Sequence, residues 1–285
     1  MLLKSKTVVV TGGSMGLGFA VARKCAREGA NVVIAARNKK DLDRALAELK
    51  KQSMGRCAAF VLDVGALNRV VDFASWCKNK FRTIHGLVNC AGIYGPIGRL
   101  NVVDLKLFED TVQINFLGTV RMCHAFYPLF DPDARKKIVN FSGGGAAAPF
   151  PNYSAYAAGK AAVVRFTENL AVEWAGDQFD INCVAPGFVV TRLHEQTMEK
   201  GAALAGESFF ENTKKQIQNG GVSPELAANL VSFLLSDQSD GITGKFISAP
   251  WDPWQDAGFQ ERLRTDKDLA TLRRIDGRTF VKSEA

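Results

Sequence analysis

A tyrosine and a lysine four residues apart are the strongest candidates for chemistry in this sequence. Tyr156 and Lys160 fall within a helical pattern over residues 155–175, so both side chains would lie on one helix face. A free tyrosine has a pKa of about 10, and a neighbouring ammonium group favours its phenolate. The pair could therefore exchange a proton with a carbonyl or alcohol oxygen, with Tyr156 as the acid or base and Lys160 as its activator.

Ser142 could complete the same reactive group. It lies at the end of a strand-like run, 14 residues before the tyrosine, and its hydroxyl could donate to an oxygen on which negative charge develops. The alternative is a turn serine that precedes three glycines. Tyr153 has Ala157, not a lysine, four residues later, so we expect it to line the substrate site instead. His124 and His194 have no serine or cysteine partner in a recognisable frame, and we expect them in the core or on the surface.

A glycine-rich turn near the start of the chain could bind phosphate. Residues 11–18 read TGGSMGLG and stand between a predicted strand and a predicted helix. In such a turn Gly12 permits the tight bend, Gly16 lets the backbone approach a pyrophosphate, and Gly18 lets helix and strand pack closely. The exposed amides at the helix start would then meet the phosphate charge. The alternative is a glycine loop that only joins two elements.

The end of the second predicted strand bears on the choice between NAD(H) and NADP(H). A fold of this kind that selects NAD commonly places an acidic residue there, on the ribose 2′-hydroxyl, and a carboxylate would repel a 2′-phosphate. Here the position holds Ala36, followed by Arg37 and Asn38. Because a guanidinium can bind phosphate through charge-assisted hydrogen bonds, we predict NADP(H) rather than NAD(H). We interpret Lys39 and Lys40 as a solvated charge run at a helix start.

Strand-like and helix-like runs alternate along the chain and must position these residues. The strand candidates are short, apolar and β-branched, which is typical of parallel strands buried on both faces. They cover residues 7–12, 31–37, 57–64, 84–92, 137–143, 179–187 and 244–249. The helical patterns between them cover residues 17–28, 40–51, 67–80, 155–175 and 224–236. The alternation predicts an α/β fold, a single doubly wound Rossmann-type domain with a seven-stranded parallel sheet.

Two stretches fall outside this alternation. Residues 193–222 follow the sixth strand and include a short amphipathic pattern around 208–218, so we expect a lid over the substrate crevice. Residues 250–285 form a C-terminal extension, which we expect to pack on its own domain or on a neighbouring subunit. Three leucines recur in it at near-helical spacing, Leu263, Leu269 and Leu272. Residues 1–249 would form the dinucleotide-binding and catalytic domain.

The charge distribution favours a phosphorylated ligand over nucleic acid. The 285-residue chain has a formal net charge of +7, but residues 1–56 alone hold 12 Lys and Arg against 4 Asp and Glu, around the glycine turn and the second strand. Six scattered cysteines and three histidines show no metal-ligand spacing. No apolar run approaches the roughly 20 residues of a membrane span. We therefore expect a cytoplasmic protein that binds no metal, membrane or nucleic acid.

Several motifs, taken in order, resemble the short-chain dehydrogenase/reductase family over almost all of residues 5–249. They are Thr-Gly-x-x-x-Gly-x-Gly at 11–18, Asp63-Val64, Asn89 to Gly92, Asn115 in a helix, Ser142, Tyr156-x-x-x-Lys160, and Pro186-Gly187 with Thr191. Tyr-x-x-x-Lys alone is unspecific, since any helix can carry it, whereas the ordered set is specific. The resemblance implies an NADP-preferring oxidoreductase that interconverts a carbonyl and a secondary alcohol by hydride transfer.

The resemblance also implies roles for individual residues. Its catalytic residues would be Asn115, Ser142, Tyr156 and Lys160. Lys160 would also hold the nicotinamide ribose, and the backbone of Asn115 would hold a water that relays protons. An asparagine in a helix could instead make only a local hydrogen bond. The cofactor contacts would be Gly12, Ser14, Gly16, Leu17, Gly18, Arg37, Asn38, Asp63, Val64, Asn89, Ala91, Gly92, Tyr156, Lys160, Pro186, Gly187, Val189 and Thr191.

The carboxyl end departs from the family pattern, in which many members finish the last strand with Asp-Gly-Gly. This chain reads GKFISAPWDPW there and continues to residue 285, so its substrate pocket or subunit interface must differ. Together with SGGGAAAPFPNYSAYAAGK and LATLRR, this segment resembles a branch linked to cell-surface glycan pathways, which implies a keto-sugar or nucleotide-sugar substrate. The family often pairs subunits through its fourth and fifth helices, and some members through the last strand. A homodimer or homotetramer is expected.

Two other functions stay open at this point. A sensor or scaffold protein would bind NADPH without turnover, although it would have no need of Ser142, Tyr156 and Lys160 together. An epimerase or dehydratase would pass through a transient ketone and would cause no net change in the redox state of the cofactor.

Overall fold

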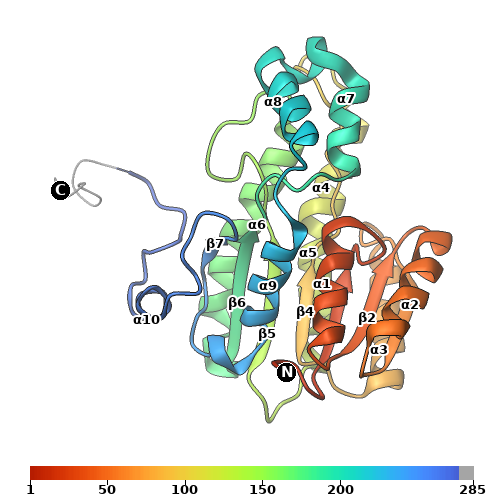
Figure 1. Cartoon of the computed structure of the whole chain (residues 1–285), viewed down its shortest axis with the longest axis vertical. Coiled ribbons are helices and arrows are strands. Elements are labelled where there is room, and N and C mark those ends of the chain that lie inside the picture. The colour runs from red at the N-terminus through yellow and green to blue at the C-terminus, as the bar shows by residue number, and fades with distance from the viewer. Residues whose placement is uncertain (276–285) are drawn as a thin grey trace.

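The computed structural model describes residues 1–275 and is built on one parallel sheet with helices on both faces (Figure 1). The strands are β1 Thr7–Thr11, β2 Asn31–Ala36, β3 Cys57–Val61, β4 Gly86–Asn89, β5 Lys136–Phe141, β6 Phe179–Ala185 and β7 Phe246–Ser248. Their order in the sheet is β3-β2-β1-β4-β5-β6-β7, and every neighbouring pair is parallel. The predicted doubly wound α/β fold with seven parallel strands is confirmed.

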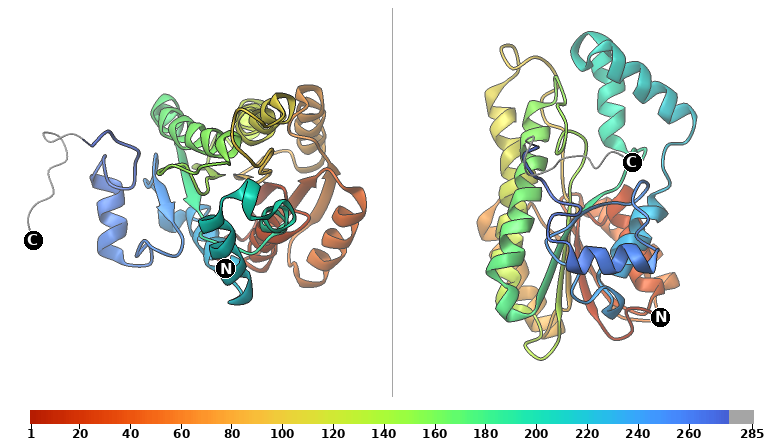
Figure 2. Two further views of the ribbon diagram at one scale, coloured as in Figure 1. Left: turned by 90° about the horizontal axis from the view of Figure 1, so that it is seen from above. Right: turned by 90° about the vertical axis from the view of Figure 1, so that its left-hand side faces the viewer.

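The helices form one layer on each side of the sheet (Figure 2). One layer consists of α1 Gly16–Arg27, α2 Lys39–Gln52 and α9 Pro224–Leu234. The other consists of α3 Leu67–Phe81, α4 Leu105–Val112, α5 Gly118–Phe126 and α6 Ser154–Glu173. A π-helical turn, Gln113–Leu117, joins α4 to α5. The sequence predicted a helix at Asn115 but not where the helices around it begin and end.

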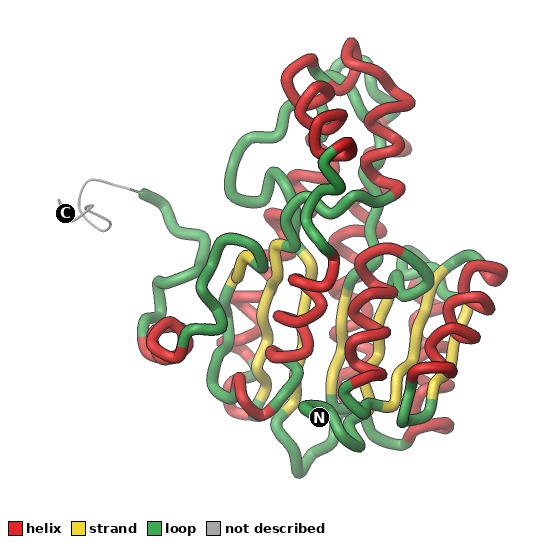
Figure 3. The backbone as a smooth tube through the Cα atoms, viewed as in Figure 1, coloured by secondary structure: helices red, strands yellow, loops and turns green. Residues whose placement is uncertain are grey.

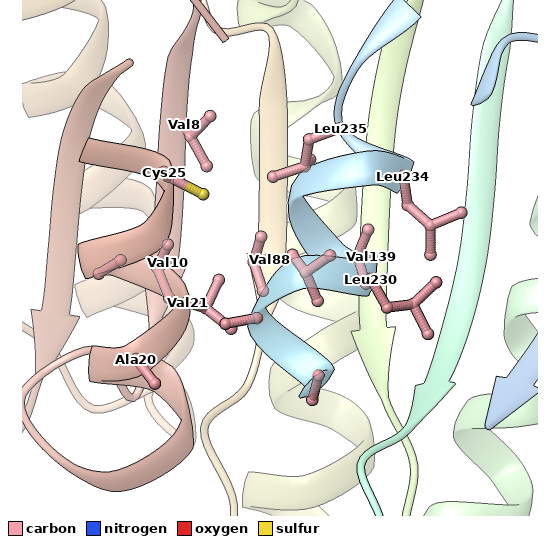
Figure 4. Packing of buried hydrophobic residues seen from close by; sticks show 14 of the residues in the cluster. Val8, Val10, Ala20, Val21, Cys25, Val88, Val139, Leu230, Leu234 and Leu235 are labelled. Atoms are coloured by element: carbon pink, nitrogen blue, oxygen red, sulfur yellow. The ribbon is translucent and has the colours of Figure 1, made fainter. Parts of the chain in front are cut away.

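The strands are continuously apolar because each face of the sheet is covered by a layer of helices. Successive strand residues point to opposite faces, so Val8 and Val10 pack beneath α1 and α9 whereas Val9 packs beneath the opposite layer. Figure 4 shows the first of these cores, where Val21 of α1 and Leu230 of α9 meet the strands. Burying one aliphatic side chain of this size contributes about 1.5–3 kcal/mol. The two cores hold the carboxyl ends of the strands at one edge.

The sheet order places a crevice at that edge. The chain turns from one half of the sheet to the other between β1 and β4, so the loops after these two strands diverge there. The hydroxyl of Thr11 accepts hydrogen bonds from the backbone N–H groups of Cys90 at 3.1 Å and Ala91 at 3.2 Å, which fixes one loop to the other. Figure 3 shows the loops that gather above the strand ends on this side.

Two helices lie above the crevice, α7 Arg192–Ala205 and α8 Glu207–Gln218 (Figure 1). The amphipathic pattern around 208–218 corresponds to α8. Helix α7 was not predicted, and the backbone of Gly201 within it is non-helical, with φ 73°. Such a break interrupts the periodicity by which a helix is recognised in sequence.

The described part of the C-terminal extension packs on its own chain. It contains helix α10, Ala257–Thr265, and the near-helical spacing of its leucines beyond that point is misleading because the helix ends at Thr265. The ammonium group of Lys245 donates to the backbone carbonyls of Asp266 at 2.6 Å and Leu269 at 3.1 Å, and so holds this segment in a non-helical path. Residues 276–285 of the predicted extension lie outside the described residues.

Within residues 1–275, no helix combines the length and the apolar character needed to cross a membrane. In the same part of the chain, His, Cys, Asp and Glu side chains form no group of three that could hold a metal ion.

Candidate active site

A cavity of about 930 Å³ lies at the carboxyl edge of the sheet, beneath the helices α7 and α8. This volume suits a large organic ligand. Two of the predicted site residues, Asn89 and Asn115, do not line it. The predicted residues that do line it are Gly12, Ser14, Gly16, Leu17, Gly18, Arg37, Asn38, Asp63, Val64, Ala91, Gly92, Ser142, Tyr156, Lys160, Pro186, Gly187, Val189 and Thr191.

The glycine turn has the backbone form that a pyrophosphate needs. Gly12 and Gly16 have φ values of +67° and +53°, which side chains rarely permit. A Cβ on Gly18 would overlap the carbonyl group of Gly12, only 2.8 Å from its carbon. Met15, at the N-cap of α1, gives no side-chain hydrogen bond to the helix start. The first N–H groups of α1 therefore remain available to an anion in the cavity, so this turn fits a dinucleotide.

The end of β2 brings Arg37 and Asn38 to the cavity. Arg37 is exposed and makes no side-chain hydrogen bond or ion pair with any residue that the structure describes. The side-chain oxygen of Asn38 accepts the backbone N–H of Asp41 at 3.0 Å, so Asn38 also caps helix α2. Arg37 can therefore turn toward a phosphate in the cavity without breaking another side-chain contact.

Asp41 lines the cavity beside Arg37 and was not predicted to do so. Its carboxylate is buried and pairs with Arg44 at 3.1 Å and with Arg192, at the start of α7, at 3.5 Å. An acidic residue in the first turn of a helix is common for electrostatic reasons alone, so the sequence carried no signal for this role. The pair Asp41–Arg192 connects α2 to the helices above the cavity.

Asp63 and Asn89, which the resemblance treats alike, lie in different surroundings. Asp63 lines the cavity, and its carboxylate accepts the N–H of Gly65 at 2.8 Å, which shapes the turn after β3. Asn89 is buried, and its amide donates to the side chain of Asn140 at 2.9 Å, which in turn donates to Thr167 at 2.9 Å. The side chain of Asn89 therefore joins β4 to β5, and through Asn140 to α6, whereas its predicted cofactor contact stays a prediction.

Tyr156, Lys160 and Ser142 meet at the cavity wall where α6 passes the end of β5. The ammonium group of Lys160 donates to the backbone carbonyl of Phe141 at 2.8 Å. The hydroxyl of Ser142 donates to the backbone carbonyl of Lys160 at 3.5 Å. The ring of Tyr156 reaches back to β5, where its hydroxyl lies against Gly143. All three predicted side chains are buried and share one wall of the cavity.

Burial controls the ionisation of this group. It raises the pKa of Tyr156 and lowers the pKa of Lys160, because both charged forms would lose solvation. The expectation that Lys160 holds the pKa of Tyr156 down is not met in this structure: the ammonium lies 5.7 Å from the centre of the tyrosine ring and is bonded elsewhere. Tyr156 therefore keeps its proton at neutral pH, as a proton donor must.

Asn115 lies behind the cavity wall, in the π-helical turn between α4 and α5. Its amide oxygen accepts the N–H of Ile93 at 2.9 Å and its amide nitrogen donates to the carbonyl of Ile93 at 2.8 Å. A Cβ on Gly92 would lie 3.1 Å from the amide oxygen of Asn115 and 3.6 Å from the ammonium of Lys160. Both side-chain contacts are therefore to the loop after β4, 22 residues away in sequence, and not the local hydrogen bond of the alternative. The water held by its backbone stays a prediction.

Aromatic side chains that the sequence did not identify line the cavity near Tyr156. They are Tyr94, Phe150, Phe188, His194 and Phe209. They come from the loops after β4, β5 and β6 and from α7 and α8, so no local pattern in the sequence links them. His194, expected in the core or on the surface, is buried and also faces the cavity.

The expectation for Tyr153 is corrected. Its side chain is fully buried and does not line the cavity. Its hydroxyl shares a hydrogen bond of 2.9 Å with the hydroxyl of Thr197. Its ring stacks on Phe150 at 4.4 Å between centroids, so Tyr153 supports the aromatic wall from behind.

Comparisons with known proteins agree with this geometry. Residues 6–202 match a family model described as short chain dehydrogenase. Dehydrogenase/reductase SDR family member 4 of Sus scrofa is 29% identical over 246 residues, which cover 86% of each chain. The oxidoreductase YxbG of Bacillus subtilis is 31% identical over 248 residues, which cover 87% of this chain and 90% of that protein.

Solved structures share the fold. An NAD⁺-bound xylitol dehydrogenase superimposes with a TM-score of 0.79 at 22% identity, covering 87% of this chain and 98% of that one. An actinorhodin polyketide ketoreductase with NADPH has a TM-score of 0.77 at 24% identity, covering 86% of this chain and 95% of that one.

Proposed function

The chain belongs to the short chain dehydrogenase family, and from this premise we propose that it interconverts a carbonyl compound, either a ketone or an aldehyde, and the corresponding secondary or primary alcohol with NADP(H). Family membership gives the general class, an oxidoreductase acting on carbonyl or alcohol groups. The observation that carries the finer proposal is a single cavity with Tyr156, Ser142 and Lys160 on one side and Arg37 with the glycine turn on the other.

Tyr156 is the proposed proton donor in the reducing direction. A nicotinamide bound in the cavity would supply the hydride, and the carbonyl oxygen then takes the phenolic proton of Tyr156. The hydroxyl of Ser142 turns toward the same oxygen and stabilises its developing charge. Lys160, whose ammonium donates to the carbonyl of Phe141 at 2.8 Å, would hold the nicotinamide ribose, as the resemblance implies. In the oxidising direction Tyr156 takes the alcohol proton.

NADP(H) is preferred to NAD(H) in this proposal because of the charges at the end of β2. Arg37 faces the cavity, and the carboxylate of Asp41 is already compensated by Arg44 and Arg192. A 2′-phosphate would complete this cluster through charge-assisted hydrogen bonds. The fold does not decide the matter, since the xylitol dehydrogenase carries NAD⁺ and the polyketide ketoreductase carries NADPH.

The proposal is tested by titrating the purified protein with NADPH and NADH and then following NADPH oxidation with a panel of carbonyl compounds. We expect tighter binding of NADPH, turnover with at least one carbonyl, and loss of turnover in Tyr156→Phe with NADPH binding retained. A stronger response to NADH would overturn the cofactor assignment. Retained turnover in Tyr156→Phe would overturn the mechanism. Tight NADPH binding without any turnover would point to a sensor, and conversion without net NADPH oxidation to an epimerase or dehydratase.

We also propose a homodimer or homotetramer, with pairing through the fourth and fifth helices of the family as the resemblance implies. Pairing through the last strand, the second mode expected from the resemblance, is disfavoured because the N–H of Phe246 in β7 already donates to the carbonyl of Ala270 at 2.6 Å. The described extension thus covers part of that sheet edge with the chain's own backbone.

Residues 193–222 are proposed as the substrate lid, since Phe209 of α8 lines the cavity from above.

A further inference from the structure

The cavity beside Tyr156 is walled by aromatic rings that contact one another. The ring of Tyr94 meets the ring of Tyr156 edge to face, with 4.9 Å between centroids and 87° between planes. On the other side Phe150 approaches Tyr156 at 6.4 Å, and Phe209 packs against Phe150 at 4.7 Å. The first substituent of a carbonyl carbon held at the Tyr156 hydroxyl would therefore contact these aromatic rings.

The charged groups of the cavity lie elsewhere. Among the described lining residues, Arg37, Asp41 and Arg192 gather at the end of β2, and Asp63 follows β3. Lys160 lies at the Tyr156 wall, but its ammonium is buried and bonded to a backbone carbonyl.

His194 at the aromatic wall and two further polar residues of the cavity lining are neutral. The ring of His194 packs against Phe188 at a tilt of 37°, with 3.9 Å between centroids, and burial lowers the pKa of its imidazole to about 4, so the ring carries no charge at neutral pH. Gln196 and Ser248 also line the cavity, and neither side chain can form an ion pair. This end can satisfy one or two hydrogen bonds of a ligand, but residues 1–275 supply no free cation there for a phosphate or carboxylate.

We propose that the substrate is an uncharged aromatic carbonyl compound, with its ring next to the reacting carbon. The inference rests on the proposed function and names the substrate class of the same site. An aromatic substituent would replace water on Tyr94, Phe150 and Phe209 and gain ring-to-ring contacts with them. A nucleotide-sugar would bring phosphate charges into this wall without a partner, and each hydroxyl of a keto-sugar would need its own hydrogen bond.

A matched pair of aldehydes tests the charge and ring requirements together. Methyl 4-formylbenzoate and 4-formylbenzoate differ only in whether the para group is a neutral ester or a carboxylate. With saturating NADPH, we expect kcat/KM for the ester to exceed that for the acid by at least about tenfold, because the charge would be desolvated without a counter-ion. A keto-sugar and a nucleotide-linked keto-sugar are assayed beside them. Equal or higher kcat/KM for the acid or for either sugar would overturn the proposal.

Two neighbouring phenylalanines of α8 provide a variant and its control. Phe209 lines the cavity, whereas Phe210 packs in the same aromatic cluster without lining it. Phe209→Ala should lower kcat/KM for the aromatic ester by roughly tenfold and change kcat/KM for propanal much less, since a short aldehyde does not reach that ring. Phe210→Ala should leave the ratio of ester to propanal unchanged. If both variants change the ratio equally, Phe209 does not contact the substrate.

A binding measurement separates failure of this inference from failure of the proposed function. If no carbonyl is reduced, the proposed function fails, and the substrate class is then tested by thermal shift with methyl 4-formylbenzoate and 4-formylbenzoate in the presence of NADP⁺. A larger rise in Tm with the ester supports an uncharged aromatic ligand. An equal or larger rise with the acid, or no rise with either, rejects it. Turnover of a sugar alone would reject the substrate class while upholding the reaction.

Discussion

The hydroxyl of Tyr156 lies against Gly143, in the space that any side chain at residue 143 would occupy. A Cβ there would lie 3.0 Å from Cζ of Tyr156 and closer still to its hydroxyl oxygen. Gly143 directly follows Ser142, so the missing side chain is what lets the end of β5 and the phenol share one wall of the cavity.

Gly143→Ala should therefore move the proposed acid without touching the phosphate turn. We expect kcat to fall by roughly 100-fold, because a displacement of about 1 Å at a reacting group has an effect of that size. The Kd for NADPH, measured by fluorescence titration, should change little. Gly144→Ala is the control, since its Cβ would lie 3.6 Å from Phe150, an ordinary contact. Similar losses of kcat in the two variants would contradict this account.

Arg37→Ala should raise the KM for NADPH by about ten- to hundredfold, because a hydrogen bond between charged groups contributes about that much to binding. The KM for NADH should stay nearly unchanged. Asp41→Asn should shift the preference the other way, toward NADPH, because it removes the negative charge next to Arg37. Lys39→Ala is the control, since Lys39 is exposed and pairs with Asp43. Steady-state kinetics with both cofactors measure the effect, and an unchanged NADPH to NADH ratio in Arg37→Ala would rule out the phosphate contact.

Asn89→Ala should lower stability rather than cofactor affinity. The variant leaves the side-chain oxygen of Asn140 without its donor in a buried site, which costs about 1–3 kcal/mol in the free energy of unfolding. Urea denaturation should show a lower midpoint, while the KM for NADPH in the folded variant should match the unmodified protein. A raised KM at unchanged stability would instead support Asn89 as a cofactor contact.

His194 should make the protein less stable as the solution becomes acidic. Burial lowers the pKa of His194 from 6.5 to about 4, so the unfolded chain binds a proton between these values that the folded chain does not. The free energy of unfolding should therefore fall as the pH drops from 6.5 toward 4, with no contribution from this group to the slope above 6.5.

Comparison with His194→Gln isolates this effect. Burial also lowers the pKa of His85, but His85 titrates in both proteins, so the difference between them reports on His194 alone. Urea unfolding at pH 7 and pH 5 should show a smaller loss of stability in the variant. The same loss in both would mean that His194 is not held neutral in the folded chain.

Truncation of the extension after Thr265 should promote self-association. It removes Ala270, which accepts the N–H of Phe246, and Arg273, which pairs with Glu168 of α6 at 3.0 Å. The exposed edge of β7 could then pair with another copy. A chain ended after Ile275 is the control, because it keeps both contacts. Light scattering should show a larger particle only for the shorter chain, and identical masses would contradict the covering role of this segment.

The sequence alone was sufficient to predict the fold and much of the site, because the signals that it carries are local to each element. The strands are apolar runs and the helices have their own periodicity, so each element can be recognised from its own residues. The glycine turn, Ser142 and Lys160 with its tyrosine follow strand ends or lie along one helix, so parallel strands bring them to the same edge. Seven parallel strands and one cavity lined by these groups are what the structure contains.

Only the tertiary structure decided the contacts between segments that lie far apart in the chain. Asn89 and Asp63 belong to motifs of equal strength, yet one is buried between strands and the other faces the cavity. Burial raises the pKa of Tyr156, although the spacing to Lys160 alone predicted the opposite direction. The aromatic wall is likewise assembled from separate loops and helices. Spacing along a chain states which residues are neighbours in one element, whereas burial and packing between elements depend on the whole fold.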